Sequence, residues 1–263
     1  MKSKAEVVVI GGGVMGCSIL FNLASRGITD TVLVERDVLG AGSTGRSSGV
    51  IRMHYSSEIN ARMAWESLKI LEDFQKIVGG DAGFEKTGFM LIVPPEARQT
   101  FEQNIAMQQA IGIDTRVISK EEANEIAPYL YVEDDAGICY EPQSGYADPP
   151  GVGQAYAAAA RDLGAELVLG NPVKEVEIKN GKVAAVVAAE GRIETSTAVL
   201  AAGPWTAKLM NKLGYDLLSE TPPQQFARPR CRRRPGEHGV LPFGKPGPDP
   251  GGQRQHRGGG RSR

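Results

Sequence analysis

Three glycines near the start of the chain have the spacing of a phosphate-binding loop. Gly11, Gly13 and Gly16 follow four consecutive apolar residues and precede an apolar stretch with the period of a helix. In such a strand–turn–helix, the glycines allow a tight turn, close approach of the backbone to a pyrophosphate, and close packing of the helix on the strand. The free amides at the helix start favour a negative charge. The pattern predicts a dinucleotide site; the alternative is a unit whose glycines serve packing only.

A carboxylate and a loop of small and hydroxyl residues follow this unit. A second apolar strand, residues 31–34, ends at Glu35, close to the spacing at which a carboxylate accepts the hydroxyls of a ribose. Residues 39–49 then read Leu-Gly-Ala-Gly-Ser-Thr-Gly-Arg-Ser-Ser-Gly. Such a loop would gather backbone donors and hydroxyls around a polyanion, and long loops without secondary structure are usually functional. The alternative is a flexible surface loop.

The composition is that of a globular chain with a sizeable core. The 263 residues include 41% hydrophobic residues, and the net charge is −1. No run of about 18 apolar residues occurs, so we expect no membrane span. The first strand begins almost at once, which leaves no room for a signal peptide. Cys17, Cys139 and Cys231 lie far apart and outside any metal-ligand pattern, so we expect free thiols, no metal site and a cytoplasmic protein.

Residues 222–263 differ from the rest of the chain. They hold nine arginines and one lysine against two acidic residues, together with eight prolines and nine glycines. Such a segment buries too little apolar surface to offset its chain entropy, so we expect it to be disordered. The same composition is typical of a GC-rich gene read in a shifted frame, and we expect a frameshifted end on a truncated homologue. The alternative is a basic tail that binds nucleic acid or an acidic partner. Because aromatic residues do not interleave with the arginines, we expect no nucleic-acid partner.

Hydrophobic periodicity predicts alternating helices and strands between these features. We expect strands over residues 7–10, 31–34, 89–93, 136–140, 165–169 and 197–201, and a three-stranded meander over 173–178, 183–189 and 192–194. The meander's turns at 179–181 and 190–191 are hairpin signals, of which Asn-Gly is the stronger. We expect helices over residues 14–26, 57–77, 96–111, 151–163 and 204–213, and a short one after the capping box Ser119-x-x-Glu122.

Together these features resemble the D-amino-acid oxidase superfamily of FAD-dependent oxidoreductases, in particular its glycine oxidase and sarcosine oxidase beta-subunit branches. The resemblance rests on the glycine fingerprint, Glu35-Arg36, the hydroxyl loop, and the meander that leads into Ala202-Gly203-Pro204-Trp205. It implies an α/β fold: an FAD-binding, Rossmann-like three-layer domain, with a central parallel sheet and a β-meander, beside an incomplete α+β substrate domain. We expect the FAD-binding domain over residues 1–78 and 148–221, the substrate domain over 79–147, and the tail over 222–263.

The resemblance implies that FAD is held by separate parts of the chain. The residues implied are Gly11, Gly13, Val14, Met15 and Gly16 at the diphosphate, Glu35 and Arg36 at the ribose, Ser43, Thr44, Arg46, Ser47, Ser48 and Gly49 in the hydroxyl loop, Val173 at the adenine, and Ala202, Gly203 and Trp205 on the opposite side.

The resemblance also implies oxidation of the C–N bond of a small amino acid or secondary amine, such as glycine, sarcosine or proline, by hydride transfer to flavin N5. Arg52 matches an arginine that binds the substrate carboxylate in sarcosine oxidase-like proteins, and a guanidinium suits that task because it can hold a carboxylate with two hydrogen bonds. The alternative is a surface arginine. His54 is a weaker candidate, as a general base, because this chemistry needs little acid–base help. Two readings stay open: a non-catalytic FAD-binding or nucleotide-binding module, and a subunit that a hetero-oligomer partner completes.

Overall fold

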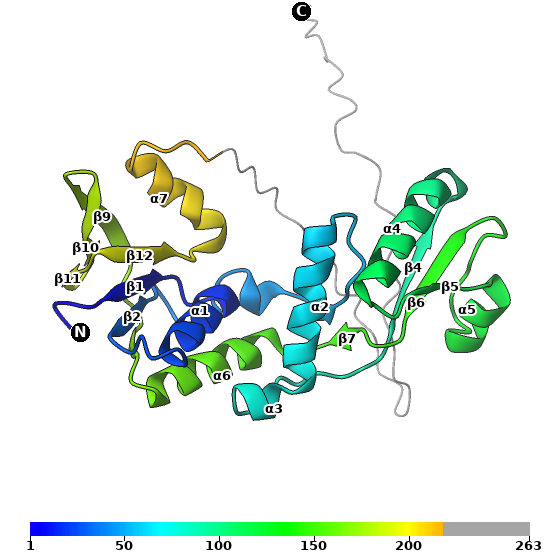
Figure 1. Cartoon of the computed structure of the whole chain (residues 1–263), viewed down its shortest axis with the longest axis horizontal. Coiled ribbons are helices and arrows are strands. Elements are labelled where there is room, and N and C mark those ends of the chain that lie inside the picture. The colour runs from blue at the N-terminus through cyan, green and yellow to red at the C-terminus, as the bar shows by residue number, and fades with distance from the viewer. Residues whose placement is uncertain (218–263) are drawn as a thin grey trace, which may run out of the picture. The chain divides into compact units, whose positions relative to one another are not determined.

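A parallel sheet of four strands forms the centre of the fold. The computed structural model describes residues 1–217. The sheet has the order β12-β1-β2-β8, with β1 at Val7–Ile10, β2 at Thr31–Val34, β8 at Glu166–Val168 and β12 at Thr197–Leu200 (Figure 1). In the central strand, Val7 pairs with Thr197 on one side and with Thr31 on the other. The sheet therefore joins the start of the chain to residues near the end of its described part.

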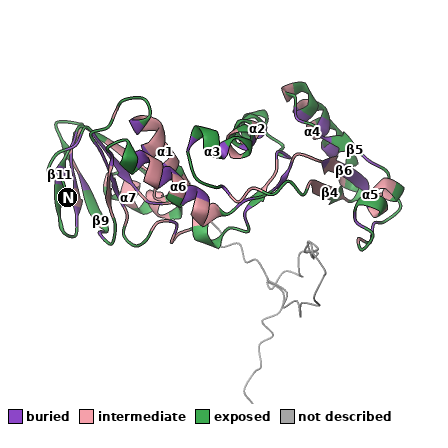
Figure 2. Ribbon diagram, turned by 90° about the horizontal axis from the view of Figure 1, so that it is seen from below, coloured by how far each residue is buried: buried purple, intermediate pink, exposed green. Residues whose placement is uncertain are grey.

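Two helices cover one face of this sheet. Helix α1 (Val14–Ala24) follows the glycine loop, and α6 (Pro149–Asp162) packs beside it. Leu20 from α1 and Tyr156 from α6 share a buried cluster with Val9 and Leu33 of the sheet. Figure 2 shows the buried residues along these helices and the adjoining strands.

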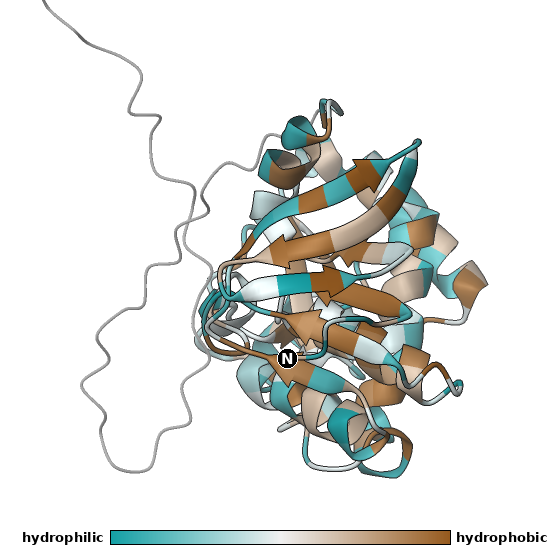
Figure 3. Ribbon diagram, turned by 90° about the vertical axis from the view of Figure 1, so that its left-hand side faces the viewer, coloured by the Kyte–Doolittle hydropathy of each residue, from teal (hydrophilic) through white to brown (hydrophobic). Residues whose placement is uncertain are grey.

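A β-meander covers the opposite face. It consists of β9 (Val173–Lys179), β10 (Lys182–Ala188) and β11 (Gly191–Glu194) in the order β11-β10-β9. Apolar residues of its strands pack on the sheet, and Figure 3 shows them along both layers. Asn180 and Gly181 have φ angles of 53° and 73°, which confirms the expected Asn-Gly hairpin turn. Helices, parallel sheet and meander form the three-layer α/β fold that the sequence predicted.

The expected single helix over residues 57–77 is wrong in one respect, because the structure divides it. Helix α2 (Glu58–Glu72) ends at Asp73, where φ is −105° and ψ is 24°, and α3 (Phe74–Ile77) follows. Buried side chains near the break belong to two clusters. Leu68 of α2 packs in the cluster around Met53, whereas Phe74 of α3 packs edge-on against Tyr156, with ring centroids 5.2 Å apart. Ile70 and Leu71 at the end of α2 already pack against the cluster of Phe74, so the change of core begins before the break.

A second, antiparallel sheet has the order β4-β6-β5, with β4 at Phe89–Val93, β5 at Arg116–Val117 and β6 at Gly137–Glu141. After the 3-10 turn η2 (Pro95–Ala97), helix α4 (Arg98–Ile111) packs Phe101 and Ile105 against Cys139 of β6. Helix α5 (Lys120–Ile126) begins where Ser119 Oγ accepts a hydrogen bond of 3.1 Å from the amide of Glu122. This contact confirms the cap that the sequence indicated.

Several elements are too short for a sequence pattern to reveal. The strands β3 (Val50–Ile51) and β7 (Gly145–Tyr146) pair with each other, and the 3-10 turn η1 (Thr44–Arg46) lies within the hydroxyl loop. A further 3-10 turn, η3 (Gly203–Trp205), leads into α7 (Thr206–Lys212). None of the helices within residues 1–217 combines the length and apolar composition that a bilayer crossing requires. The expectations for residues 222–263 lie outside the described residues, and the segment boundaries of the domains stay predictions.

Candidate functional site

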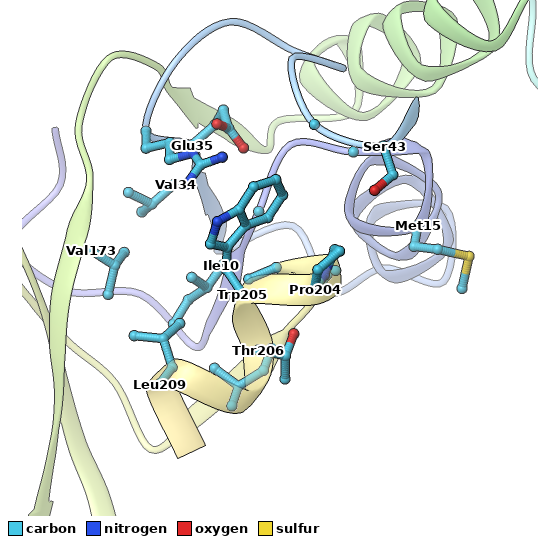
Figure 4. Close-up of a pocket in the computed structure, with 18 of the residues that line it drawn as sticks. Ile10, Met15, Val34, Glu35, Ser43, Val173, Pro204, Trp205, Thr206 and Leu209 are labelled. Carbon is cyan, nitrogen blue, oxygen red and sulfur yellow. The ribbon is translucent and has the colours of Figure 1, made fainter. Parts of the chain in front are cut away.

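A cleft of about 900 Å³ opens where three strands of the parallel sheet end (Figure 4). Ile10, Val34 and Leu200, the last residues of β1, β2 and β12, lie in its lining. The carboxyl edge of an open parallel sheet is the usual place for ligands, because helix N-termini and loops meet there. The glycine loop, the hydroxyl loop and the η3–α7 segment provide the walls.

The glycine loop is shaped for close backbone contacts. Gly11 has a φ of +115°, and a Cβ there would lie 2.5 Å from the carbonyl oxygen of Ala201. A Cβ on Gly16 would overlap the carbonyl oxygen of Gly11. Glycine is therefore required at both positions for β1, α1 and the end of β12 to come this close. Gly16 itself does not line the cleft, and acts on it through this packing.

The start of α1 presents amide donors to the cleft. The amide of Val14 donates to Thr44 Oγ1 at 3.0 Å, which ties the hydroxyl loop to the helix. In residues 1–217, the amides of Gly13 and Met15 donate to no acceptor. Unpaired amides at a helix N-terminus, together with the helix dipole, form an anion site. A diphosphate suits this place.

Glu35 is fixed at the end of β2. Its Oε2 accepts a hydrogen bond of 2.6 Å from the amide of Gly12, and its Oε1 accepts one of 3.0 Å from the amide of Asp37. Each carboxylate oxygen has two lone pairs, so both oxygens can accept a further hydrogen bond. This geometry allows Glu35 to bind sugar hydroxyls while its side chain is held in place.

Trp205 and Arg36 line the cleft and contact each other. The guanidinium carbon of Arg36 lies 3.9 Å from the centroid of the Trp205 ring, a cation–π contact. The same ring lies near Gly42, where a Cβ would come within 3.3 Å of it. Figure 4 shows the indole between Glu35 and Pro204.

The structure brings most of the expected cofactor-binding residues into one cleft. Gly16 and Gly49 are buried outside the lining, and Arg46 and Ser48 are exposed outside it. The expected residues that line the cleft are Gly11, Gly13, Val14, Met15, Glu35, Arg36, Ser43, Thr44, Ser47, Val173, Ala202, Gly203 and Trp205.

Sequence reasoning missed the lysines of the lining. Lys208 and Lys212 on α7 and Lys174 on β9 belong to it, and Lys212 Nζ donates to the carbonyl of Lys174 at 3.0 Å. One signal was available: Lys208 and Lys212 are four residues apart, so they share a face of the helix that Trp205 introduces. Thr206 and Leu209 of the same helix also line the cleft.

Arg52 and His54 lie outside the cleft lining, on the segment after β3. Arg52 Nη1 donates to the carbonyl of His54 at 2.7 Å, and the guanidinium carbon lies 5.0 Å from the ring of Tyr55 and 5.5 Å from that of Phe89. In residues 1–217, no carboxylate forms an ion pair with Arg52. Arg52 is thus a half-buried cation between two aromatic rings.

The pKa shifts of His54, Cys17 and Cys139 all favour the uncharged forms of these side chains. Burial, and then the charge of Arg52, lower the pKa of His54. Burial raises the pKa of Cys17 to about 11, and that of Cys139 to about 11, so neither thiol is activated. Within residues 1–217, no group of three His, Cys, Asp or Glu side chains is placed to hold a metal ion.

Comparisons with known proteins point to one family. A model of the family described as "DAO: FAD dependent oxidoreductase" matches residues 6–257. The mitochondrial sarcosine dehydrogenase of Mus musculus is 29% identical over 221 residues, which cover 81% of this chain and 24% of that protein. The mitochondrial pyruvate dehydrogenase phosphatase regulatory subunit of Mus musculus is 31% identical over 210 residues, 80% of this chain and 24% of that protein.

A solved structure of an oxidoreductase is also similar to this chain. The crystal structure of L-proline dehydrogenase from P. horikoshii aligns with a TM-score of 0.76 and 32% identity, over 81% of this chain and 57% of that one. The chain therefore spans about a quarter of the length of the two curated relatives and 57% of the solved structure.

Proposed function

This chain belongs to the family of FAD-dependent oxidoreductases, and on that premise we propose that it oxidises the C–N bond of a small amino acid or secondary amine, such as glycine, sarcosine or proline. FAD is the cofactor of the family, and when bound it supplies the acceptor for the hydride removed from the carbon beside the amine. Because the chain spans only part of its relatives' length, substrate and activity are proposals.

The described residues fit FAD. The amides of Gly13 and Met15 are free to bind the diphosphate, and Glu35 retains lone pairs for the adenosine ribose. A side chain at Gly11 would clash with the backbone of Ala201, so glycine at this position keeps the ends of β1 and β12 close together at the edge of the cleft. These residues hold and orient the cofactor, and Thr44 keeps the hydroxyl loop against the start of α1.

The observation that carries the substrate proposal is the unpaired guanidinium of Arg52. A half-buried arginine without a carboxylate partner is costly unless an anion from outside completes it. The rings of Tyr55 and Phe89 flank it and restrict its orientation. A substrate carboxylate is the anion that an amino acid provides, and it matches the guanidinium in shape and charge.

Two measurements test the proposal. First, the purified chain is incubated with FAD, freed of excess, and its visible absorption recorded; folded protein that retains no flavin contradicts the proposal. Second, reduction of an artificial dye is followed with sarcosine, glycine and proline. Arg52→Lys keeps the charge but loses the two-pronged contact, so KM should rise roughly tenfold or more. Arg62→Lys is the matched control, because Arg62 is exposed and pairs with Glu58 on α2.

A second candidate function is a non-catalytic flavoprotein subunit. The similarity to a regulatory subunit favours it, and a hetero-oligomer partner would then complete the assembly. A chain that retains FAD but reduces no dye with any of the three amines, alone or in its native complex, would support this candidate over the enzyme.

A further inference from the structure

A buried acidic residue lies beneath the segment that carries Arg52. Glu141, the last residue of β6, has no exposed surface. Its Oε2 accepts hydrogen bonds from the amide of Met53 at 3.1 Å and from Ser144 Oγ at 2.8 Å. Glu141 therefore holds the residue between Arg52 and His54 by its backbone.

The other oxygen of Glu141 has no hydrogen-bond partner in residues 1–217. Nδ1 of His54 lies 3.9 Å from Oε1, and the same Nδ1 lies 3.6 Å from Cys139 Sγ. The ring of Phe101 stacks on His54, with centroids 5.9 Å apart. A buried anionic oxygen without a hydrogen-bond partner is very costly, so this site favours the protonated carboxyl; at 3.9 Å, Nδ1 of His54 is too far away to form a hydrogen bond with it.

All three titratable groups of this cluster favour their uncharged forms. Burial is the largest cause and raises the pKa of Glu141, while the amide of Met53, the hydroxyl of Ser144, the charge of Arg52 and the amide of His54 oppose that rise. Burial lowers the pKa of His54, and the charge of Arg52 lowers it further. Cys139 stays a thiol, since burial and then Glu141 raise its pKa to about 11.

The charged and titratable groups around Glu141 are few. The segment after β3 contributes Arg52 and His54, and β6 itself contributes Cys139. Helix α4 contributes the uncharged Phe101, and the neighbouring strand β4 places Phe89 opposite Glu141 in register. Arg52, which lies against that same Phe89 ring, is the permanent charge of the group.

We propose that Glu141 is a positioning residue. As a neutral carboxylic acid with its proton on Oε1, it orients the Arg52 segment without neutralising Arg52, and so leaves that guanidinium to bind the carboxylate of an amino-acid substrate. The inference rests on the role proposed above for Arg52. It adds that carboxylate binding depends on the protonation of a second residue, and that binding is lost when Glu141 ionises.

The first test reads the proton directly in the full chain without substrate. The side-chain carboxyl carbon of Glu141 is labelled with ¹³C and followed by NMR against pH, with Glu141→Gln for assignment. A protonated carboxyl near neutral pH is expected, with the imidazole of His54 uncharged. A carboxylate already ionised near neutral pH overturns the inference, whatever the protein oxidises.

The second test uses acetate as the probe and the side-chain nitrogen resonances of Arg52 as the readout. The wild-type chain should bind acetate with an affinity that falls roughly tenfold as Glu141 ionises. Glu141→Gln mimics the neutral acid, so it should bind acetate as the wild type does at neutral pH and keep that affinity at alkaline pH. Glu66→Gln, on the exposed face of α2, is the control and should retain the wild-type profile.

A second variant keeps the test decisive if Glu141→Gln does not fold. Ser144→Ala removes a donor that stabilises the ionised carboxyl, so the loss of acetate binding should move to higher pH. An unmoved profile, or no acetate binding that depends on Arg52, overturns the inference. Acetate binding with the expected profile in a flavin-loaded chain that oxidises no amine would instead overturn the proposed enzymatic function alone.

Discussion

At the scale of single residues, Gly16 makes a backbone contact that leaves no room for a side chain. Gly16→Ala places a methyl group against the carbonyl of Gly11, which cannot withdraw because it belongs to the loop between β1 and α1. We expect a loss of about 1–3 kcal/mol in the free energy of unfolding, measured by urea denaturation, and weaker FAD retention. Gly153→Ala is the control: it lies within α6, its Cβ would come no closer than 3.9 Å to Val14, and it should be neutral or stabilising.

Glu141 gives the pH dependence of stability a definite sign. Its pKa is raised by burial above the ordinary value of 4.5, so the folded state holds this proton more tightly than the unfolded state. The free energy of unfolding therefore falls as pH rises above that ordinary value, until the carboxyl ionises in the folded state too. Glu141→Gln removes this contribution, so its stability relative to the wild type should increase with pH.

Urea denaturation of both proteins from about pH 4 to about pH 9 measures the difference. The lowered pKa of His54 acts in the opposite direction, because it contributes stability that is lost as pH falls through the acid range. Provided that Glu141→Gln leaves the environment of His54 unchanged, this contribution cancels in the difference. A difference that stays constant over the whole range would contradict a raised pKa for Glu141.

At the scale of elements, the hairpin between β9 and β10 depends on its turn. Asn180 and Gly181 both have positive φ, as a type I′ turn requires. Gly181→Val forces a β-branched residue into this conformation and should cost about 1–3 kcal/mol, observed as a lower Tm. Lys182→Val, the first residue of β10, is the control and should change the Tm little. Equal decreases in Tm for Gly181→Val and Lys182→Val would contradict a specific requirement for positive φ at residue 181.

The elements also show how far sequence reasoning reaches. The strands of the parallel sheet, the glycine loop and the cap at Ser119 were predicted correctly, because their signals are local: a run of apolar residues, a spacing of glycines, or two residues three apart. The break at Asp73 was not predicted, because the apolar periodicity continues through it from α2 into α3.

Some residues of the candidate site were predicted from a local motif, whereas others come together only through tertiary packing. Glu35 and Thr44 were predicted because a motif places them, and both line the cleft. Lys174 and Lys212 meet only after α7 packs near β9, so no local pattern reveals them. Glu141 ends a strand in which polar and apolar residues mix, and its complete burial is a tertiary property that a single sequence does not encode locally.

At the scale of the whole molecule, FAD should stabilise the fold because its cleft joins separate segments of the chain. β1, β2, β9 and α7 all contribute to the lining. A ligand that binds only the folded state adds about 2.7 kcal/mol when present at 100 times its Kd. We expect the Tm to rise by several degrees in the presence of FAD and to rise less with riboflavin, which lacks the diphosphate. Equal shifts in Tm with FAD and with riboflavin would contradict a diphosphate site at the amides of α1.

The pairing of β1 with β12 has a consequence for the order of events during synthesis. β1 leaves the ribosome first, yet its neighbour at Thr197–Leu200 is translated only after most of the described chain. Until then β1 has β2 on one side, but its other edge has no strand beside it. The cleft also lacks the wall that Trp205 and α7 provide. Long-range parallel pairing of this kind is slow, and leaves strand edges exposed to other chains in the meantime. A nascent polypeptide released before residue 197 would therefore carry the complete glycine fingerprint and still be unable to capture its flavin.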